Sequence, residues 1–412
     1  MNSLQAKDTV VIIGAGQAGC EAAIELRRLG FAGQVTVVGD EPHLPYRRPP
    51  LSKTYFSGAA DRNSLTLVSQ VSLDKANIKF LSSARAICID RVARDVEFSG
   101  GGRLPYTKLL LATGSRPRPL TLPGADRPNV FPLRTISDVD AIRRNRSETC
   151  RIVVVGGGYI GLEVAASATA MGHKVTVLES LDRVLARATV PEVSAFYERV
   201  HRERGVDVRT RSTILDLEGD PRVTHVRLSD GTRLEADLVV FGIGVLPNVE
   251  LAAEAGLAVE NGIVVDEFTQ TADPHVHAAG DCTNHPNEFL GRRVRLESVP
   301  NAIEQARTAA HVMMGQAKPY RAVPWFWSDQ FDLKLQMVGI AEGFDHLVVR
   351  GDIAAGHNFS AFCLRDGKVV AATTVNRTQE FLIAKKLVAA GSLVDPAQLV
   401  DETISLATLI PT

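Results

Sequence analysis

Cysteine is scarce in this sequence, and no two cysteines lie close together. The five present are Cys20, Cys88, Cys150, Cys282 and Cys363. They form no CxxC motif and no zinc-like ligand spacing, which argues against a thioredoxin-type dithiol and a cysteine-bound structural zinc. Widely separated thiols are typical of proteins in a reducing compartment, so we expect a cytoplasmic location.

The sequence also lacks an excess of one charge and a long apolar run. Its 46 Lys and Arg residues against 47 Asp and Glu residues leave a formal net charge of -1. Without a long-range basic field, we expect neither a nucleic-acid partner nor attachment to an anionic membrane. The first apolar run, Val10 to Ile13, stops at glycine, and no run is long enough to span a membrane or to act as a secretory leader.

The length and composition indicate several folded domains. A chain of 412 residues is too long for one hydrophobic core, and typical domain sizes predict two to four units. Apolar residues make up 45% and charged residues 23%, which is typical of a globular protein. We therefore expect packed cores rather than covalent cross-links to stabilise it.

Two stretches of the chain repeat the order strand, glycine turn, helix, strand. In each, a short β-branched apolar run stops at glycine, as a buried parallel strand does. A helical pattern and a second apolar strand follow. Each stretch therefore predicts a βαβ unit, and the two belong to separate domains. The predicted segments are 9–16, 22–30 and 34–38 in the first stretch and 151–155, 162–171 and 174–178 in the second.

Other segments suggest how the chain returns between domains. The apolar stretches 108–114 and 238–244 are predicted to be strands ending in glycine, each placed to bring the chain back to a domain boundary. Further along the chain, Asp366 and Gly367 separate two short alternating segments and predict a β-hairpin. We therefore expect a smaller α+β domain at the C-terminal end.

The first glycine turn has the fingerprint of a dinucleotide site. In GAGQAG, Gly14 permits a tight turn, Gly16 lets a pyrophosphate approach the backbone, and Gly19 lets helix and strand pack closely. The N-terminus of the helix then offers N–H groups to phosphate oxygens. Asp40 and Glu41 follow the second strand, where an acid accepts ribose hydroxyls. A glycine turn that merely packs is the alternative for one isolated fingerprint.

A second complete fingerprint strengthens the dinucleotide interpretation. GGGYIG contains Gly156, Gly158 and Gly161 between a strand and a helix, and Glu179 ends the second strand. A carboxylate at that position accepts the free 2′-hydroxyl of NAD and repels the 2′-phosphate of NADP. We therefore predict NADH over NADPH, although the nearby cation of Arg183 keeps NADPH open.

Six longer motifs occur along nearly the whole chain. They are RPPLSK at 48–53, LATGSRPRPL at 111–120, VVVGGGYIGLEVAA at 153–166, AAGDC at 278–282, RLESVPNAIEQAR at 295–307 and PWFWSDQ at 324–330. In these motifs and their order, the sequence resembles the FAD-dependent ferredoxin reductases that serve bacterial oxygenase systems. Several long motifs in the right order are far more specific than one glycine turn.

The resemblance implies an α/β fold with two Rossmann-like dinucleotide-binding domains, one for FAD and one for NAD, and a C-terminal α+β domain. The FAD-binding domain would be discontinuous, comprising residues 1–116 and 247–323. The NAD-binding domain would occupy residues 117–246, and the C-terminal domain residues 324–412. This architecture is shared with glutathione-reductase-like flavoproteins.

The resemblance also assigns roles around the flavin. Arg48 and Lys53 would lie at the flavin, with Lys53 near its redox-active edge and Glu163 as the ion-pair partner of that lysine. A lysine there can stabilise negative charge on a reduced flavin, and a buried lysine needs a carboxylate to stay charged. Asp281 would bind the ribityl chain, and Trp327 would lie beside the flavin on the partner-facing side.

The resemblance and the fingerprints together give the full set of expected site residues. The segment Val299 to Ala302 would lie under the isoalloxazine ring. Lys53, Glu163 and Trp327 are the expected catalytic residues. The expected dinucleotide contacts are Gly14, Gly16, Gly19, Asp40, Glu41, Arg48, Lys53, Ala112, Thr113, Gly114, Arg134, Gly156, Gly158, Tyr159, Ile160, Gly161, Glu163, Glu179, Gly244, Gly280, Asp281, Val299, Pro300, Ala302 and Trp327.

Ordinary alternatives exist for the three expected catalytic residues. Lys53 could be a solvated lysine after a proline turn, since most lysines are exposed. Glu163 could be an acid at a helix start, favoured by the helix dipole. Trp327 follows Trp325 and Phe326 and could be a strand residue that packs a core.

As a function, the resemblance implies an NADH:ferredoxin oxidoreductase. Tightly bound FAD would accept a hydride from the co-substrate NADH and pass electrons singly to a [2Fe-2S] ferredoxin, which feeds a monooxygenase or dioxygenase. Such ferredoxins are usually acidic, so we expect a transient electrostatic complex with a basic dock, for which Arg292, Arg293 and Arg295 are the candidates. An ordinary solvated turn is the alternative for these three arginines. The reductase itself would be a monomer or a weak dimer.

Proteins with this fold also have other functions. Disulfide reductases need a redox cysteine pair beside the flavin, and the NADH oxidase and peroxidase branch needs one reactive cysteine within 41–53. This sequence has neither. An NADH-sensing interaction module and a rubredoxin reductase remain as alternatives.

One short stretch has the chemistry of a metal site. His275, His277, Asp281, Cys282 and His285 lie close together in the sequence. The resemblance already assigns Asp281 to the flavin, and no second pair of ligands lies nearby. We therefore expect no metal here.

Overall fold

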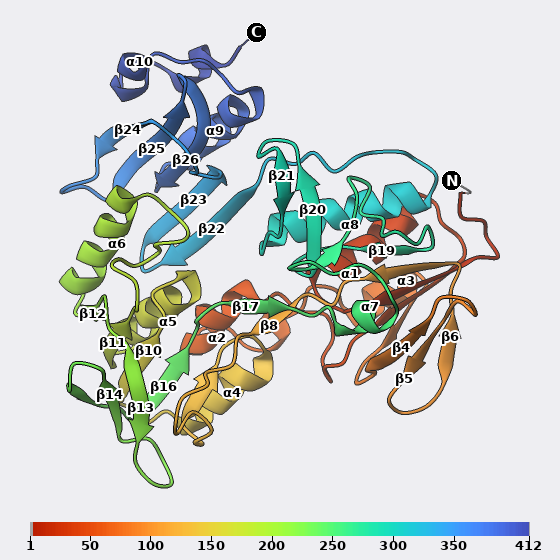
Figure 1. The fold of residues 1–412 in the computed structure, drawn as a ribbon, viewed down its shortest axis with the longest axis horizontal. Coiled ribbons are helices and arrows are strands. Elements are labelled where there is room, and N and C mark those ends of the chain that lie inside the picture. Colours follow the sequence, from red (N-terminus) through yellow and green to blue (C-terminus); the bar gives the residue numbers. More distant parts are fainter. Residues whose placement is uncertain (1–2, 412) are drawn as a thin grey trace. The chain divides into compact units, whose positions relative to one another are not determined.

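The computed structural model describes residues 3–411, and the chain divides into two units. The first unit combines residues up to 47 with 63–116 and 246–324, and the second combines 48–62, 117–245 and the residues from 325 onward. Each unit contains one glycine fingerprint and one five-stranded parallel sheet (Figure 1).

The parallel sheet of the first unit carries the first fingerprint. In sheet order, its strands are β19 (Val276–Ala278), β7 (Lys108–Leu111), β1 (Thr9–Ile13), β2 (Gln34–Val38) and β3 (Ile78–Leu81). The three central strands are apolar and buried on both faces, as expected for a covered parallel sheet. Ile13 pairs with Val38 and with Leu111, so β1, β2 and β7 end at the same edge.

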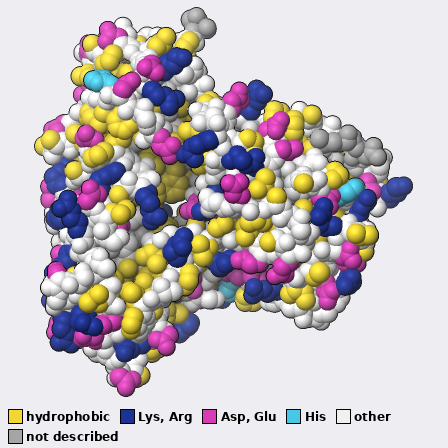
Figure 2. Space-filling view, in the orientation of Figure 1, with side chains coloured by type: hydrophobic (Ala, Val, Ile, Leu, Met, Phe, Trp, Pro, Cys, Tyr) yellow, Lys and Arg dark blue, Asp and Glu magenta, His cyan; other side chains and the backbone are white. Residues whose placement is uncertain are grey.

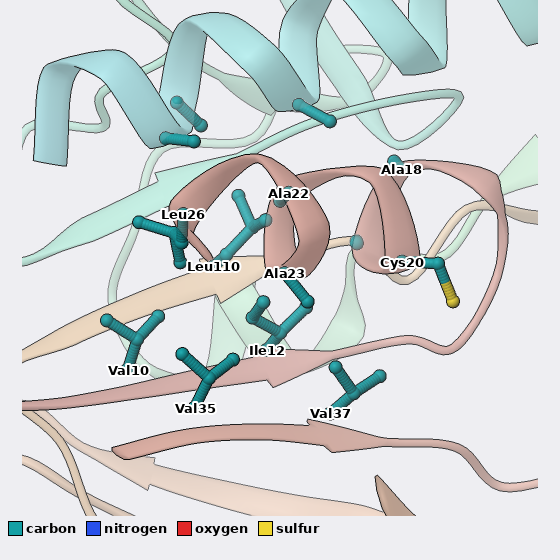
Figure 3. Packing of buried hydrophobic residues seen from close by; sticks show 14 of the residues in the cluster. Val10, Ile12, Ala18, Cys20, Ala22, Ala23, Leu26, Val35, Val37 and Leu110 are labelled. Carbon is teal, nitrogen blue, oxygen red and sulfur yellow. The ribbon is translucent and has the colours of Figure 1, made fainter. Parts of the chain in front are cut away.

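Two alanine-rich helices pack beside this sheet. α1 (Gln17–Arg28) begins after the first glycine turn, and α8 (Val299–Met313) comes from the last segment of the unit. Figure 3 shows α1 lying on the sheet, with Ala23 above Ile12 and Leu26 above Val10. Alanines of both helices belong to this same buried cluster, because small side chains let the helices approach closely.

Smaller elements complete the first unit. A three-stranded antiparallel sheet follows β3 in the chain, and another three-stranded sheet precedes α8. These remaining elements are β4 (Ala86–Asp90), β5 (Asp95–Phe98), β6 (Arg103–Pro105), β18 (Ile263–Val264), β20 (Thr283–Asn287), β21 (Arg292–Val294), α3 (Gln70–Lys75), α7 (Glu250–Glu254) and the 3-10 turn η2 (Asn63–Leu65).

The second unit repeats this plan. In sheet order, its parallel strands are β12 (Asp207–Arg209), β11 (Lys174–Leu178), β10 (Arg151–Val155), β16 (Leu238–Phe241) and β9 (Val130–Pro132). The first helix of the βαβ unit is α5 (Tyr159–Ala170), and α6 (Pro191–Glu203) follows β11. A three-stranded meander precedes β16, just as β4, β5 and β6 precede β7. Its strands are β13 (Ile214–Glu218), β14 (His225–Leu228) and β15 (Arg233–Glu235).

The C-terminal part of the second unit is an antiparallel sheet with a helix packed against it. In sheet order, its strands are β22 (Trp325–Gln330), β23 (Leu333–Gly339), β26 (Lys368–Val375), β25 (Asn358–Arg365) and β24 (His346–Asp352). α9 (Thr378–Ala390) packs on β23 and β26. The predicted hairpin is confirmed, since β25 and β26 pair across Asp366 and Gly367, which have φ of +52° and +74°.

Short elements fill the rest of the second unit and the crossings between units. The polypeptide passes from the first unit to the second within β8 (Ser115–Pro117) and returns within β17 (Val245–Pro247). These two strands pair with each other. The other short elements are the 3-10 turn η1 (Pro49–Ser52), α2 (Thr54–Ser57), α4 (Ile136–Asn145), α10 (Pro396–Val400) and the 3-10 turn η3 (Leu406–Leu409).

The predicted α/β fold class is confirmed, and β2, β10 and β11 begin and end at the predicted residues. Both fingerprint helices begin earlier than predicted, at Gln17 and Tyr159. The first turn of each contains the third glycine of its fingerprint, Gly19 or Gly161, which interrupts the amphipathic pattern. The division into three domains remains a prediction.

The surface agrees with the balanced composition. On the face drawn in Figure 2, Lys and Arg side chains are interspersed with Asp and Glu rather than gathered into one field. Within residues 3–411, no helix is both long and apolar enough to cross a membrane.

Candidate dinucleotide sites

The first and third glycines of each fingerprint are required by packing within the protein. Gly14 and Gly156 have φ of +115° and +105°, a region that favours glycine. A Cβ at Gly14 would lie 2.0 Å from the Ala112 carbonyl oxygen. A Cβ at Gly19 would lie 1.9 Å from the Gly14 carbonyl oxygen, and the third glycine of the second turn, Gly161, is equally confined. These glycines permit the tight turn and the close packing of helix on strand.

The second glycine of each fingerprint has a different environment. A Cβ at Gly16 or Gly158 would meet no protein atom within 4 Å. Their backbones are extended, with φ of -83° and -80°, which any residue adopts. Each is the N-cap of its helix and makes no side-chain capping hydrogen bond, so the first N–H groups of α1 and α5 can bind a ligand. Open space and N–H donors at both turns fit a pyrophosphate group.

Glu179 follows β11 and is bound by the second glycine turn. Its carboxylate accepts hydrogen bonds from the backbone N–H groups of Gly157 at 2.8 Å and Leu181 at 2.9 Å. These two donors hold a negative charge beside the turn, where the adenosine ribose of a dinucleotide binds in this fold. A 2′-phosphate at the ribose would be repelled by the Glu179 carboxylate.

Arg183, the cation that kept NADPH open, is bound elsewhere. Its guanidinium donates to the carbonyl oxygens of Thr189 and Ala186, both at 2.9 Å, and to the Ser194 hydroxyl at 2.5 Å. These acceptors hold the side chain against its own loop and the start of α6. Arg183 could pair with a 2′-phosphate only if these hydrogen bonds broke.

The acids after β2 come later in the chain than the acid after β11. Gly39 occupies the first position after β2, and a Cβ there would lie 2.8 Å from the Ala15 Cβ. Asp40 is exposed, and Glu41 accepts a hydrogen bond from the Tyr46 hydroxyl at 2.7 Å. The position next to the strand therefore has no room for a side chain, which explains why the acids follow it.

The loop after β7 contains Ala112, Thr113 and Gly114. The Thr113 hydroxyl donates to the Asn248 carbonyl oxygen at 2.6 Å, and the Asn248 side-chain amide donates to the Thr113 carbonyl oxygen at 2.8 Å. The backbone N–H of Asn248 donates to the Gly114 carbonyl oxygen at 2.9 Å. Asn248 thus fixes the loop whose Ala112 carbonyl faces the first glycine turn.

The loop after β19 contains Gly280 and Asp281, which two polar side chains hold. The Ser115 hydroxyl donates to the Asp281 carboxylate at 2.8 Å, and the Gly280 N–H donates to the Gln305 side-chain oxygen at 2.8 Å. The same oxygen accepts from the Thr283 hydroxyl at 2.9 Å. Gln305 is fully buried on α8, so this helix positions the loop that carries Asp281.

The N-terminus of α8 contains Val299, Pro300 and Ala302. The Ser298 hydroxyl caps the helix by accepting from the Asn301 backbone N–H at 3.2 Å. Pro300 lies in the first turn, where its missing N–H costs nothing. Pro300 and Ala302 are buried and Val299 is half-buried.

The predicted residues of the first unit gather at one edge of its parallel sheet. Gly14 follows β1, Asp40 follows β2, Ala112 follows β7 and Gly280 follows β19. These strands are parallel neighbours, so the four segments leave the same carboxyl edge. Open α/β sheets bind their ligands at that edge.

Lys53 and Glu163 form an ion pair within the second unit. The lysine Nζ lies 2.8 Å from Oε1 of Glu163 and donates to the Pro49 carbonyl oxygen at 3.3 Å. Only 3% of the Glu163 side chain and 18% of the Lys53 side chain are exposed. The structure therefore brings the two residues together, and their role at a flavin remains a prediction.

Two other predicted residues of the second unit, Arg48 and Arg134, are neighbours. Arg48 Nη1 donates to the Arg134 carbonyl oxygen at 2.8 Å. Gly244 lies in the loop after β16, at the carboxyl edge of the second parallel sheet, with φ of +104°. Its carbonyl oxygen accepts from the Arg118 backbone N–H at 2.9 Å.

The aromatic residues near the second fingerprint are only partly enclosed. The rings of Tyr159 and Phe326 lie 4.6 Å apart, and burial raises the pKa of the Tyr159 hydroxyl well above its ordinary value. Ile160 is 41% exposed, which is high for a large apolar residue at a helix start. Trp327 is half-buried, with its ring 6.4 Å from that of Phe326.

Two of the three arginines expected to form a basic dock also have partners inside the first unit, and the dock itself remains a prediction. Arg293 donates to the carbonyl oxygens of Val265 and Asn284, both at 2.5 Å. Arg295 pairs with Glu297, and only 13% of its side chain is exposed. The charge of Arg295 is therefore largely neutralised within the protein.

The short stretch with metal-ligand chemistry does not form a cluster. Across residues 3–411, no group of three or more His, Cys, Asp or Glu side chains could hold a metal ion. His285 Nδ1 lies 2.9 Å from the Gln305 amide nitrogen. Burial lowers the pKa of His285 to about 4 and that of His277 to about 3.

Several residues that hold the predicted site in place were missed in the sequence. A signal existed for Gln305, which is a polar residue on the buried face of an alanine-rich helix, and for Ser328, which interrupts an aromatic strand. No sequence signal pointed to Asn248. The missed residues are Ser52, Ser115, Asn248, Gln305 and Ser328.

Comparison with known proteins places this architecture in a family. A family model described as pyridine nucleotide-disulphide oxidoreductase matches residues 8–306, and one described as reductase C-terminal matches residues 325–410. The putidaredoxin reductase of Pseudomonas putida is 46% identical, covering 99% of this chain and 98% of that protein. The rhodocoxin reductase of Rhodococcus erythropolis is 43% identical, covering 98% and 94%.

Solved structures give the same result. A putidaredoxin reductase in its covalent complex with putidaredoxin superposes with a TM-score of 0.95 at 45% identity, covering 98% of this chain and 99% of that one. The ferredoxin reductase for the CYP199A2 system of Rhodopseudomonas palustris also gives 0.95, at 42% identity, covering 98% and 100%. The chain therefore belongs to the pyridine nucleotide-disulphide oxidoreductase family and, within it, to the ferredoxin reductases similar to putidaredoxin reductase, which use FAD and a nicotinamide dinucleotide.

Proposed function

We propose that FAD binds at the fingerprint of Gly14 and NADH at the fingerprint of Gly156, in the service of electron transfer to a [2Fe-2S] ferredoxin. One observation carries this proposal: Gly16 and Gly158 face open space at a helix N-terminus, although no described neighbour requires glycine there. Bound FAD would supply the central chemistry, taking one hydride from NADH and releasing its two electrons singly.

The overall reaction balances with two ferredoxins for each NADH. A hydride carries two electrons and one proton. NADH therefore becomes NAD⁺, each of two oxidised ferredoxins gains one electron, and one proton is released to solvent. The residues of the chain contribute binding, orientation and charge.

In the first unit, the carboxyl edge of the parallel sheet would bind FAD. Asp40 and Glu41 would accept ribose hydroxyls, and Thr113 would lie in the loop beside the pyrophosphate. Asp281, held by the Ser115 hydroxyl, would accept from the ribityl chain. The first turn of α8 would lie under the flavin ring.

In the second unit, Lys53 would stand at the flavin edge, held by Glu163, with Arg48 nearby. Glu179 would select NADH, because its carboxylate repels a 2′-phosphate and Arg183 is bound to three other acceptors. This assignment corresponds to an FAD domain of residues 1–116 and 247–323, an NAD domain of 117–246 and a C-terminal domain of 324–412.

The partner would be a small acidic ferredoxin that binds transiently, with the reductase as a monomer or weak dimer. The covalent putidaredoxin reductase–putidaredoxin complex of a solved relative supports a redox-protein partner. All five cysteines of this chain are unpaired, which suits the reducing cytoplasm.

The direct test is anaerobic reduction of the purified yellow protein. NADH should bleach the flavin absorbance faster than NADPH does, and added ferredoxin should restore it with two ferredoxins reduced per NADH. A colourless protein would contradict the FAD assignment. Fast turnover with rubredoxin but not with ferredoxin would favour a rubredoxin reductase, and no turnover with either would favour an NADH-sensing module.

The electrostatic character of the complex predicts a salt effect. If the ferredoxin complex depends on exposed charges, raising the ionic strength from about 0.01 M to about 0.15 M should slow ferredoxin reduction several-fold, since the screening length shortens from about 30 Å to about 8 Å. Reduction of the flavin by NADH should change less and serves as the internal control. A ferredoxin rate that does not respond to salt would contradict the electrostatic dock.

A further inference from the structure

Glu163 is a buried carboxylate enclosed by hydrogen-bond donors. Its Oε1 lies 2.8 Å from Lys53 Nζ and accepts from the Ser328 hydroxyl at 2.7 Å, and its Oε2 accepts from the Ser52 hydroxyl at 2.5 Å. Ser52 and Ser328 are themselves buried, with 1% and 0% exposure. The ion pair with Lys53 is therefore only part of what holds this carboxylate.

The hydrogen bonds continue from Ser328 to a buried histidine. The Gln330 side-chain amide donates to the Ser328 hydroxyl oxygen at 3.2 Å, and the Gln330 side-chain oxygen lies 2.9 Å from Nε2 of His201. Gln330 and His201 are both 0% exposed. A continuous chain of buried polar groups thus runs from α6 through β22 to Glu163 on α5.

The Glu163 carboxylate determines which group donates in each hydrogen bond of this series. An ionised carboxylate only accepts, so Ser328 must donate its single hydroxyl proton to Glu163. The Ser328 oxygen can then accept from the Gln330 amide, which leaves the Gln330 oxygen facing His201. His201 must therefore carry its proton on Nε2, and its Nδ1 has no hydrogen-bond partner among residues 3–411. Burial lowers the pKa of His201 to about 4, so the ring is neutral at pH 7.

This series of hydrogen bonds forms because the residue spacing along β22 matches the spacing of helical turns along α5. The Phe326 ring lies against that of Tyr159, and two residues later Ser328 reaches Glu163, which is one helical turn beyond Tyr159. Two strand residues span about 6.7 Å and four helical residues about 6 Å, so successive inward side chains of β22 meet successive turns of α5. Gln330, the next inward residue, meets His201 on α6.

We propose that Ser328, Gln330 and His201 are positioning residues, which fix Glu163 and thereby the Lys53 ammonium at the flavin edge. This inference rests on the proposed function, which puts Lys53 at the flavin. Donors that all point toward one carboxylate polarise one another and hold its charge in place. With the Ser328 hydroxyl absent, Glu163 would draw Lys53 more strongly and leave less positive charge for the reduced flavin.

The first experiment compares Ser328→Ala with a matched control in the FAD-loaded protein. Ser392→Ala is the control, because Ser392 is also buried (1% exposed) and its hydroxyl has no partner among residues 3–411. Ser328→Ala should make the midpoint potential of bound flavin more negative and slow flavin reduction by NADH about tenfold, the usual effect of losing a hydrogen bond to a charged group. Ser392→Ala should leave both unchanged.

A second variant covers the case in which Ser328→Ala does not fold or bind FAD. Ser328→Cys keeps the volume and supplies only a weak donor, so it should shift the potential in the same direction by a smaller amount. A potential equal to that of wild type in Ser328→Cys and Ser328→Ala would overturn the inference, as would a wild-type potential in Ser328→Cys alone if the alanine variant cannot be prepared.

The far end of the chain gives a stricter test. His201→Phe keeps the ring that lies 5.0 Å from Phe331 and removes the donor to Gln330. It should shift the flavin potential less than Ser328→Ala does, and it should have no further effect in the Ser328→Ala background, because the chain is already broken there. Independent, additive shifts would contradict a connected chain.

Lys53→Met separates failure of this inference from failure of the proposed function. If Lys53→Met does not alter the flavin potential, Lys53 is not at the flavin and the proposed site is wrong. If Lys53→Met alters the potential but Ser328→Ala does not, the proposed site stands and the positioning role of Ser328, Gln330 and His201 is wrong.

Discussion

At the scale of single residues, some fingerprint glycines are required for packing and others leave room for a ligand. Gly14 cannot take a side chain, because its φ is positive and the Ala112 carbonyl oxygen lies 2.0 Å from the position of a Cβ. Gly16 and Gly158 have extended backbones and open space. A methyl group at either position should therefore affect ligand binding more than the stability of the fold.

Gly158→Ala should lower the unfolding midpoint only slightly, because alanine is a poorer N-cap than glycine. It should lower kcat/KM for NADH about tenfold or more, because a methyl group in the path of a pyrophosphate costs about 1–3 kcal/mol, as overpacking does elsewhere. Its flavin content should equal that of wild type. Gly16→Ala should instead reduce the FAD content of the purified protein. Steady-state kinetics and flavin absorbance per protein measure the two effects.

Gly100→Ala is the matched control for both substitutions. Gly100 also has open space around its Cβ position and lies away from both fingerprints. Its variant should match wild type in stability, flavin content and NADH kinetics. Loss of stability in Gly158→Ala with normal NADH kinetics would contradict a pyrophosphate site there.

Glu179 provides the second prediction at this scale. Glu179→Gln removes the negative charge and one of the two acceptors for Gly157 and Leu181, so the ratio of kcat/KM for NADH to that for NADPH should fall about tenfold or more. The control is Glu203→Gln, an exposed acid paired with Arg199 on α6. An unchanged ratio in Glu179→Gln would place cofactor selection elsewhere.

At the scale of elements, single polar side chains tie segments together. Gln305 on α8 binds both Gly280 in the loop after β19 and Thr283 at the start of β20, and Arg350 on β24 binds the last described turns of the polypeptide. Arg350 is only 5% exposed. The acceptors of its guanidinium are the Glu380 carboxylate and the carbonyl oxygens of Leu399, Asp401, Glu402 and Ile404.

Arg350→Lys should destabilise the protein although it conserves the charge. A lysine has three donors on a point charge and cannot reach acceptors that a planar guanidinium reaches. The free energy of unfolding in urea should fall by about 3 kcal/mol, as when one partner of a buried ionic network is lost, and residues after 399 should become sensitive to protease. Arg365→Lys, at an exposed site on β25, should change neither property.

At the scale of the whole molecule, both units contain histidines that stay neutral. Burial lowers the pKa of His277 to about 3 and those of His285 and His201 to about 4. His277 and His285 belong to the first unit and His201 to the second. In the unfolded chain, these side chains take up protons below about pH 6.5.

Stability should therefore fall steeply in mild acid. The contribution of these histidines is fully present above about pH 6.5 and is lost as the pH falls toward 4, because only the unfolded chain binds the protons. Near pH 5, the three should give a slope of about 4 kcal/mol per pH unit, at 1.36 kcal/mol for each. Urea unfolding between pH 7 and pH 5 measures the slope, and His277→Leu should reduce it by about a third. An unchanged slope in His277→Leu would contradict this account.

The sequence by itself determined the local structure and the family. β2, β10 and β11 could be predicted to the residue, because short β-branched runs bounded by glycine have few other solutions. The two fingerprints and the hairpin at Asp366 and Gly367 are likewise local, since each depends on the φ angles and sizes of adjacent residues. Motif order along the chain then identified the ferredoxin reductases.

Only the tertiary structure decided which partners the charged and polar side chains have. Arg183 is bound to Ser194 and two carbonyl oxygens, and Arg295 to Glu297, so neither is the exposed cation that its position suggested. Ser328 meets Glu163 across 165 residues of chain. Such hydrogen bonds depend on where the chain returns after folding, and adjacent residues carry no signal of it.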